Sequence, residues 1–117
     1  MAKNVIYNDG DRLAVACTDP ATPASGDPVL YGQRPGVALT SEGTDGLTSV
    51  DFKAVPNLSV KAIDGSGNSA VAEGDIIYYV SGDTPKLSKK ATGVRFGYAM
   101  GAVTSAATAT IPVKIGY

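Results

Sequence analysis

Residues 93–102 read Gly93-Val94-Arg95-Phe96-Gly97-Tyr98-Ala99-Met100-Gly101-Ala102, and this stretch decides between two kinds of fold. Its glycines recur at every fourth residue, a spacing typical of membrane helices that pack against each other. The same stretch alternates with a period of two, which places Val94, Phe96 and Tyr98 on one face of a strand. Residues 96–113 carry no charge, but they contain several serines and threonines and a proline. The pattern therefore predicts a β-strand and no membrane span.

The opposite face of this predicted strand is nearly bare. It carries Gly93, Arg95, Gly97 and Gly101, together with Ala99. Glycines on a strand let another backbone approach closely, or let the strand coil sharply, as the wall of a small barrel requires. We predict that these glycines and Arg95 form a docking face, where another backbone or an aromatic side chain packs.

Short strands separated by turns fill the rest of the chain. Besides the stretch above, the alternation predicts strands at residues 12–17, 29–31, 37–40, 47–55, 57–63, 75–80 and 109–115. No window has the period of an amphipathic helix. The sequence therefore predicts one small all-β domain, a barrel or sandwich of about seven to nine short strands. We place an extended N-terminal arm at residues 1–11 and the β-barrel domain at residues 12–117.

The hydrophobic residues of the chain are mostly small. Gly, Ala, Ser and Thr make up 49 of the 117 residues, whereas the chain has six Leu, six Ile, two Phe and no Trp. A domain of this size buries about two thirds of its unfolded surface. Because small side chains supply most of that surface, we expect a thin core that neighbouring subunits help to complete.

The composition excludes most catalytic chemistry. The chain has no histidine, which excludes Ser-His-Asp and Cys-His catalysis and histidine metal sites. Its one cysteine, Cys17, has no partner for an internal disulfide, and it shares an alternating face with Leu13 and Val15. We interpret Cys17 as a core thiol. A net charge of −1 argues against nucleic acid as a partner. We predict no enzymatic activity, no metal and no cofactor.

One loop imitates a calcium site. Asp64, Ser66, Asn68 and Asp75 have the spacing of four ligands in a calcium-binding loop. However, Ser69 stands where the sharp turn needs glycine, and Asp75 stands where a bidentate glutamate is expected. We interpret the loop as a turn between strands.

Two stretches of the chain resemble each other. Ser25-Gly26-Asp27-Pro28-Val29-Leu30-Tyr31 recurs as Glu73-Gly74-Asp75-Ile76-Ile77-Tyr78-Tyr79, and each copy leads to a second strand that begins with Gly-Val. In such a turn the glycine takes the turn dihedral and the aspartate binds nearby backbone amides. Two similar turns and an ancient duplication both explain the likeness.

Short motifs follow one another along nearly the whole chain, in the order Asp9-Gly10-Asp11-Arg12-Leu13, Ser25-Gly26-Asp27-Pro28-Val29, Gly36-Val37-Ala38-Leu39, Gly74-Asp75-Ile76-Ile77-Tyr78-Tyr79, Gly97-Tyr98-Ala99-Met100 and Ile111-Pro112-Val113-Lys114-Ile115. This order resembles the capsid cement, or decoration, proteins of tailed bacteriophages that are grouped as domain of unknown function 2190.

The resemblance implies a structural virion protein that is made in the host cytoplasm and binds the outer surface of the expanded phage head. It implies a homotrimer at threefold and quasi-threefold positions of the major capsid protein. Such a trimer bridges capsomers and stabilises the shell against the pressure of packaged DNA.

The predicted arm has no apolar stretch of the kind that forms a secretory signal. We predict that it adds as a strand to a sheet edge of the capsid protein or of a neighbouring subunit, with its last three residues as apolar anchors. A frayed terminus is the alternative. The arm residues are Ala2, Lys3, Asn4, Val5, Ile6 and Tyr7.

Two other functions remain open. The base of a head fibre or a tail-associated β-module needs the same strands, although we expect a long C-terminal extension in a fibre. A glycan-binding β-domain displayed on the particle needs aromatic platforms, for which the candidates are Tyr31, Tyr78, Tyr79 and Tyr98.

Overall fold

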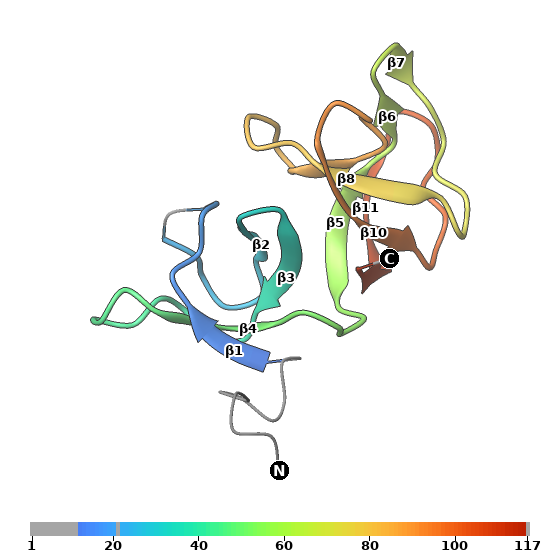
Figure 1. Ribbon diagram of the computed structural model, residues 1–117. Coiled ribbons are helices and arrows are strands. Elements are labelled where there is room, and N and C mark those ends of the chain that lie inside the picture. The colour runs from blue at the N-terminus through green and yellow to red at the C-terminus, as the bar shows by residue number, and fades with distance from the viewer. Residues whose placement is uncertain (1–11, 21, 117) are drawn as a thin grey trace, which may run out of the picture.

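The computed structural model describes residues 12–20 and 22–116 (Figure 1). These residues form β-strands and no helix, so none of them lies in a helix long and apolar enough to cross a membrane. The eleven strands are β1 (Arg12–Val15), β2 (Pro28–Tyr31), β3 (Arg34–Ala38), β4 (Thr48–Asp51), β5 (Asn57–Lys61), β6 (Ile63–Asp64), β7 (Gly67–Asn68), β8 (Ile76–Tyr79), β9 (Leu87–Ser88), β10 (Val94–Ala99) and β11 (Thr108–Ile115).

The strands form two lobes, which lie side by side in Figure 1. Strands β1 to β4 form an antiparallel sheet in the order β1-β4-β3-β2, which we call the N-terminal sheet. Strands β5 and β8 to β11 form a closed barrel in the order β10-β11-β5-β9-β8. Strands β6 and β7 form a small separate hairpin. The prediction of an all-β domain that contains a barrel is confirmed.

The eight predicted strands all occur, with shifted ends. Strand β3 begins at Arg34, three residues before the predicted start at Val37. Pro35 fits there because β3 pairs with β4 only through Val37 and Ala38, so the missing amide of Pro35 breaks no bond on that side. The three additional strands, β6, β7 and β9, have two residues each.

The two lobes repeat one arrangement of four strands. Read from β5, the barrel has the order β5-β11-β10-β8, which matches β1-β4-β3-β2 in the N-terminal sheet, and β9 then fills the place between β8 and β5. The turn before β2 has its counterpart before β8. The Ala24 amide donates to Asp27 Oδ2 at 3.0 Å, and the Ala72 amide donates to Asp75 Oδ2 at 2.8 Å. The glycine before each aspartate has a φ of 89°.

The likeness continues into the strands. The backbone carbonyl of each turn aspartate accepts a hydrogen bond from a strand alanine, Ala38 in the N-terminal sheet (2.9 Å) and Ala99 in the barrel (2.8 Å). Ala38 pairs with Val50 across the ladder, and Ala99 pairs with Val113 in the same way. The sequence likeness therefore extends to a structural repeat of the four-strand unit, which two similar turns alone do not explain.

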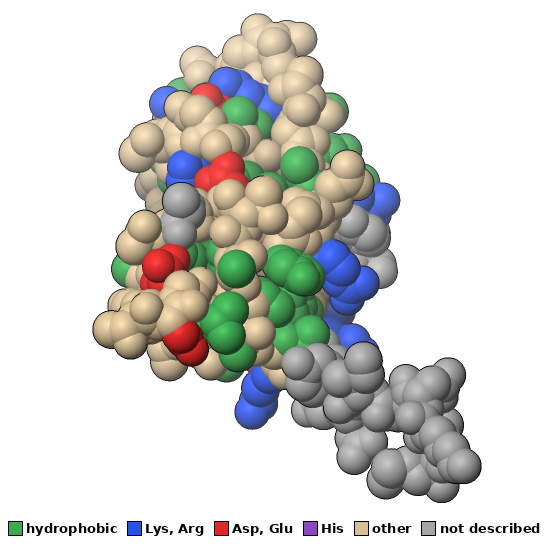
Figure 2. Space-filling model, turned by 60° about the vertical axis from the view of Figure 1, so that its left-hand side comes forward, with side chains coloured by type: hydrophobic (Ala, Val, Ile, Leu, Met, Phe, Trp, Pro, Cys, Tyr) green, Lys and Arg blue, Asp and Glu red, His purple; other side chains and the backbone are tan. Residues whose placement is uncertain are grey.

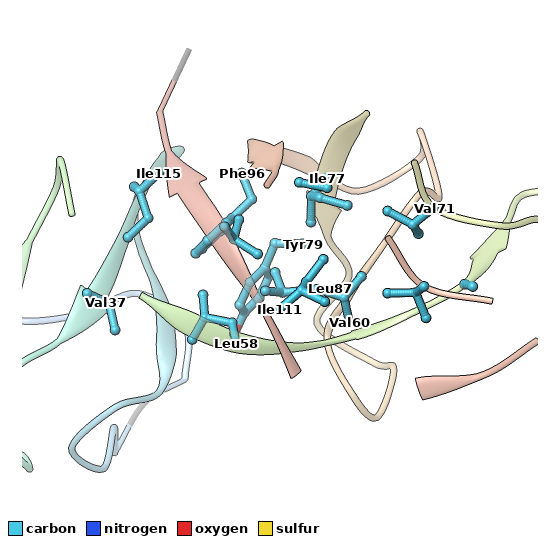
Figure 3. Packing of buried hydrophobic residues seen from close by; sticks show 14 of the residues in the cluster. Val37, Leu58, Val60, Val71, Ile77, Tyr79, Leu87, Phe96, Ile111 and Ile115 are labelled. Atoms are coloured by element: carbon cyan, nitrogen blue, oxygen red, sulfur yellow. The ribbon is translucent and has the colours of Figure 1, made fainter. Parts of the chain in front are cut away.

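Each lobe has its own buried cluster. The cluster of the N-terminal sheet consists of Val29, Ala38, Val50 and Phe52. The cluster of the barrel is larger and includes Tyr79, Phe96 and Leu87, whose side chains meet in its centre (Figure 3). Leu30 and Val37 of the N-terminal sheet belong to the barrel cluster, so the two lobes share part of one core.

A buried tyrosine also joins the lobes. Tyr79 of β8 is 1% exposed, and its hydroxyl donates a hydrogen bond to Asp19 Oδ1 at 3.0 Å. Asp19 follows β1 in the chain and forms a bridge with Leu30 of β2. Burial raises the pKa of Tyr79 well above its usual value, and the hydrogen bond to Asp19 raises it further. The hydroxyl therefore stays protonated and holds the N-terminal sheet against the barrel.

Candidate functional site

The glycines of the predicted docking face lie against other strands of this chain. A Cβ atom added to Gly97 would lie 2.0 Å from the carbonyl oxygen of Lys114 in β11. At Gly93 it would lie 2.4 Å from the carbonyl oxygen of Tyr79, and at Gly101 3.3 Å from Cβ of Ile111. The close approach that these glycines allow is therefore made by β8 and β11. Docking of another subunit on this face stays a prediction.

The strict alternation predicted for this stretch is wrong beyond Arg95. A bulge lies between Arg95 and Gly97, because these two residues pair with the successive residues Tyr78 and Ile77 of β8. Phe96 is the extra residue, and it is fully buried. A bulge sets two residues of one strand against one of its partner, so the faces exchange at that point. Arg95 therefore does not share a face with Gly97.

The bulge brings Arg95 and Tyr98 together. The Arg95 guanidinium donates a hydrogen bond to the Tyr98 hydroxyl, and its central carbon lies 5.4 Å from the centroid of the Tyr98 ring. Both side chains are half-buried. Arginine stacked on tyrosine combines a large apolar surface with a fixed charge, which is a combination enriched at protein interfaces. This pair is the part of β10 best suited to contact a partner.

Cys17 packs with Leu13 and Val15, as the alternating pattern predicts. It is half-buried and lies against the core of the N-terminal sheet. Burial raises the pKa of its thiol above the usual value. The thiol therefore stays protonated at neutral pH and lacks the character of a reactive cysteine.

The carboxylates of the calcium-like loop are used in turns. Asp64 Oδ1 accepts hydrogen bonds from the amides of Ser66 (2.8 Å) and Gly67 (3.1 Å), which closes the turn between β6 and β7. The Ala72 amide, together with Lys89 at 3.3 Å, lowers the pKa of Asp75 below its usual value. Both carboxylates therefore stabilise local structure in this chain.

The tyrosines considered for glycan stacking lie in different surroundings. Tyr79 is buried in the barrel, which removes it from any surface. Tyr78 and Tyr98 are half-buried, and Tyr31 is 47% exposed. These four side chains therefore do not form one exposed aromatic platform.

A basic cleft lies where the two lobes meet. Its volume is about 350 Å³, and its lining residues are Arg34, Pro35, Phe52, Lys53, Lys114, Ile115 and Gly116. The Arg34 guanidinium carbon lies 5.8 Å from the centroid of the Phe52 ring. Three cations in one cleft suit a carboxylate of a partner segment. Sequence reasoning missed this cleft because its cations come from distant parts of the chain.

A second cleft of about 280 Å³ also lies between the lobes. Prolines from both lobes line it, together with polar and charged side chains; its residues are Pro20, Asp27, Pro28, Ser59, Asp83, Thr84, Pro85 and Lys86. The ammonium nitrogen of Lys86 lies 5.8 Å from the centroid of the Tyr79 ring.

The predicted arm residues Ala2, Lys3, Asn4, Val5, Ile6 and Tyr7 lie outside the described residues. Within the described chain, the candidate surfaces for a partner are the Arg95–Tyr98 pair, the basic cleft and the exposed large apolar side chains, which are Tyr31, Leu39, Leu47, Val55 and Met100. Among the described residues, no group of three or more Cys, Asp or Glu side chains is placed to hold a metal ion.

Comparison with known proteins adds the family. A family model described as phage cement protein matches residues 7–115. No curated protein and no solved structure matches the chain. The match covers both lobes of the structure and agrees with the resemblance of the sequence motifs. The chain therefore belongs to the phage cement protein family, whose members are structural proteins of the phage capsid.

Proposed function

We propose that this cement protein binds the outer surface of the expanded phage head as a homotrimer, at threefold and quasi-threefold positions of the major capsid protein. There it bridges neighbouring capsomers and resists the outward pressure of packaged DNA. The observation that carries the proposal is the family match over residues 7–115, which spans the whole two-lobed body.

The junction between the lobes supports a bridging role. A bridge must transmit force from one attachment point to the other, so its parts must not move independently. Leu30 and Val37 of the N-terminal sheet are buried in the barrel cluster, and Tyr79 is bonded to Asp19 across the junction. An attachment to either lobe is therefore stiffly connected to the other.

Each lobe offers an apolar side chain at the same place of the repeat. Leu39 follows Ala38 of the N-terminal sheet and is 44% exposed, and Met100 follows Ala99 of the barrel and is 51% exposed. Their amides also make corresponding hydrogen bonds, to the carbonyls of Ser49 and Pro112. Repeated apolar contacts suit a shell that is itself built from repeated subunits.

The arm of residues 1–11 is the second part of the proposed mechanism. Ala2 to Tyr7 adds as a strand to a sheet edge, with Val5, Ile6 and Tyr7 as anchors. Three barrels associate in one closed trimer, so that contacts with the shell that are weak singly become strong together by avidity. Strand β10 with its two ends, where Gly93, Arg95, Gly97 and Gly101 lie, is the proposed place where subunits of the trimer meet.

Deletion of residues 1–7 tests the arm. The truncated chain is expected to fold, because the described body from Arg12 onward contains both buried clusters. Its binding to expanded heads, measured by co-sedimentation, is expected to be lost. A matched pair of full-length variants separates the anchors from the rest of the arm: Val5→Ser with Ile6→Ser should lose binding, whereas Lys3→Ser with Asn4→Ser should keep it. Undiminished binding of the truncated protein would refute the role of the arm.

A further inference from the structure

The positive charge of the basic cleft is not balanced by the residues that line it. The cleft contains three cations, and none of its described lining residues is acidic. The second cleft differs, because Asp27 and Asp83 lie there together with Lys86. The chain as a whole has a net charge of −1, so the positive charge of the basic cleft is a local feature.

Other cations of the chain are neutralised by its own carboxylates. Lys89 and Lys90 each form an ion pair with an aspartate, at 3.3 and 2.8 Å. Within residues 12–20 and 22–116, neither Arg34 nor Lys114 of the basic cleft forms such a pair. These two cations can therefore bind a carboxylate that another protein supplies.

The walls of the cleft come from both lobes and are held in place. In the N-terminal sheet, the Arg34 guanidinium lies against the ring of Phe52, which is 5% exposed. In the barrel, the fully buried Ile115 follows Lys114, and its amide donates a hydrogen bond to the carbonyl of Ala54 at 3.2 Å. A site whose parts are positioned beforehand loses less conformational freedom when a partner binds.

Charges of opposite sign are also separated on the surface. In the lower half of Figure 2, where the N-terminal sheet lies, Lys and Arg side chains lie mainly to the right of the gathered hydrophobic side chains, and Asp and Glu side chains lie to their left. A surface on which one sign of charge gathers attracts partners of the opposite sign and orients them as they approach.

The size of the cleft favours a side chain over a nucleic acid strand. Its volume of about 350 Å³ is near the lower end of the range for sites that hold small ligands. A nucleic acid strand is instead bound along an extended basic groove that follows several phosphates. On the surface of a protein shell the anionic groups are the carboxylates of Asp and Glu, whose two oxygens match the fork of an arginine.

We propose that the basic cleft binds the carboxylate of an acidic side chain of the major capsid protein, with Arg34 and Lys114 as its direct partners. This inference rests on the proposed function, and it names the surface of contact and the chemical class of the capsid residue. Because Arg34 belongs to the N-terminal sheet and Lys114 to the barrel, one carboxylate attaches both lobes at their junction.

Removal of the two charges tests the cleft. The cleft variant, Arg34→Gln with Lys114→Gln, is expected to bind expanded heads about tenfold or more weakly than the wild type in co-sedimentation. The control variant, Lys61→Gln with Lys86→Gln, removes the same number of charges outside the basic cleft and should bind like the wild type. Equal binding by the two variants would refute the role of the cleft.

Two further variants separate charge from structure. Arg34→Lys with Lys114→Arg keeps both charges and should keep most of the binding. Lys114→Gln alone leaves the contact between Arg34 and Phe52 in place and should still weaken binding. Circular dichroism and denaturant unfolding check that each chain is folded. Loss of binding with the charge-preserving variant but not with Lys114→Gln would show that the shape of the cleft matters and its charge does not.

Modification of the heads identifies the anion. A carbodiimide with ethanolamine converts the accessible carboxylates of the heads to neutral amides. The wild type and the control variant are expected to bind modified heads as weakly as the cleft variant binds untreated heads, whereas the cleft variant should lose little more. This is the pattern expected when the two changes remove the same contact. Equal further losses for all three chains would refute the inference.

Salt provides a measurement that needs no modified heads. The difference in affinity between the wild type and the cleft variant should shrink as the sodium chloride concentration rises, because salt screens the attraction between the charges. A difference that does not depend on salt would show that no ion pair was lost.

The remaining outcomes identify other partners. If the cleft variant changes the mass of the free protein in light scattering while the control variant does not, the cleft binds another copy of this chain and the inference is refuted. Heads that bind the wild type and the cleft variant equally well refute only the role of the cleft. Heads that bind none of the chains refute the proposed function, and this inference with it.

Discussion

At the scale of single residues, Tyr79 connects several properties of the molecule. Its ring lies in the barrel core, stacked on Phe96 with centroids 6.2 Å apart, and its hydroxyl reaches Asp19 beside the N-terminal sheet. A buried hydroxyl without a partner is costly, so this hydrogen bond both satisfies the tyrosine and fixes the junction. The sequence predicts that Tyr79 lies in a strand. It does not identify Asp19 as the partner of the hydroxyl, because 60 residues separate the two.

Tyr79→Phe is expected to lower the free energy of unfolding by about 1.5–2 kcal/mol, because it removes one buried hydrogen bond to a charged group. Denaturant unfolding measures this change. Tyr31→Phe is the matched control, since Tyr31 is 47% exposed, and its effect should stay within about 0.5 kcal/mol. Equal effects of the two substitutions would show that the bond to Asp19 contributes nothing.

The raised pKa of Tyr79 predicts a loss of stability at alkaline pH. In the unfolded chain a tyrosine ionises near pH 10, whereas burial keeps Tyr79 protonated in the folded chain. The contribution of Tyr79 is therefore complete below about pH 10 and is lost as the pH rises further. Above that pH, the wild type should lose about 1.4 kcal/mol per pH unit more than Tyr79→Phe does. Unfolding curves of both chains at a series of pH values measure this difference. Stabilities of the wild type and Tyr79→Phe that fall in parallel above about pH 10 would contradict the prediction.

Gly97 is the residue of β10 with the least room. A Cβ atom there meets the Lys114 carbonyl at 2.0 Å, and only movement of the β11 backbone relieves that contact. Gly97→Ala is therefore expected to cost about 1–3 kcal/mol or more in thermal or denaturant unfolding. Gly65→Ala is the control, since nothing lies within 4 Å of its Cβ position. If Gly97→Ala is as stable as this control, β10 and β11 are not packed as closely as described.

At the scale of elements, the repeated turn makes a paired prediction. Asp27→Ala and Asp75→Ala each remove the acceptor of one backbone amide, that of Ala24 or Ala72. Each is expected to destabilise the chain by about 1 kcal/mol, and Asp75→Ala slightly more because it also loses Lys89. Denaturant unfolding of both variants tests this. A loss at one position alone would show that the two turns are alike in geometry but not in energy.

The elements also show how much of the fold the sequence can predict. Period-two alternation and Gly-Asp turns locate the eight longer strands, because each of these signals is local. Strand β9 is not predictable in this way, because its two residues, Leu87 and Ser88, are too few to show a period. The bulge at Phe96 is not predictable either, because a bulge is defined by the pairing with the partner strand.

The candidate site was less predictable than the fold. Gly93, Gly97 and Gly101 do allow a close approach, but the approaching atoms belong to β8 and β11 of the same chain, and docking of another subunit there stays a prediction. The basic cleft joins Arg34, Lys53 and Lys114, which are distant in the sequence and become neighbours only when the two lobes meet. A surface of this kind depends on tertiary packing and leaves no local pattern.

At the scale of the whole molecule, the many small residues allow strands to pack closely within a body of two lobes. The N-terminal sheet has a core of four buried residues, whereas the barrel has a larger core closed by β9. A cement protein is used in many copies on one shell, so neighbouring copies are present at high local concentration. Contacts on the capsid are therefore expected to complete the thin core of the N-terminal sheet.

The proposed function requires that the protein binds expanded heads and stabilises them. DNA-filled heads that lack the protein are heated with and without added purified protein, and the temperature at which DNA is released is recorded. The added protein is expected to co-sediment with the heads and to raise that temperature, whereas the chain lacking residues 1–7 is expected to do neither. Protein that stays in the supernatant and leaves the release temperature unchanged would contradict the proposed function.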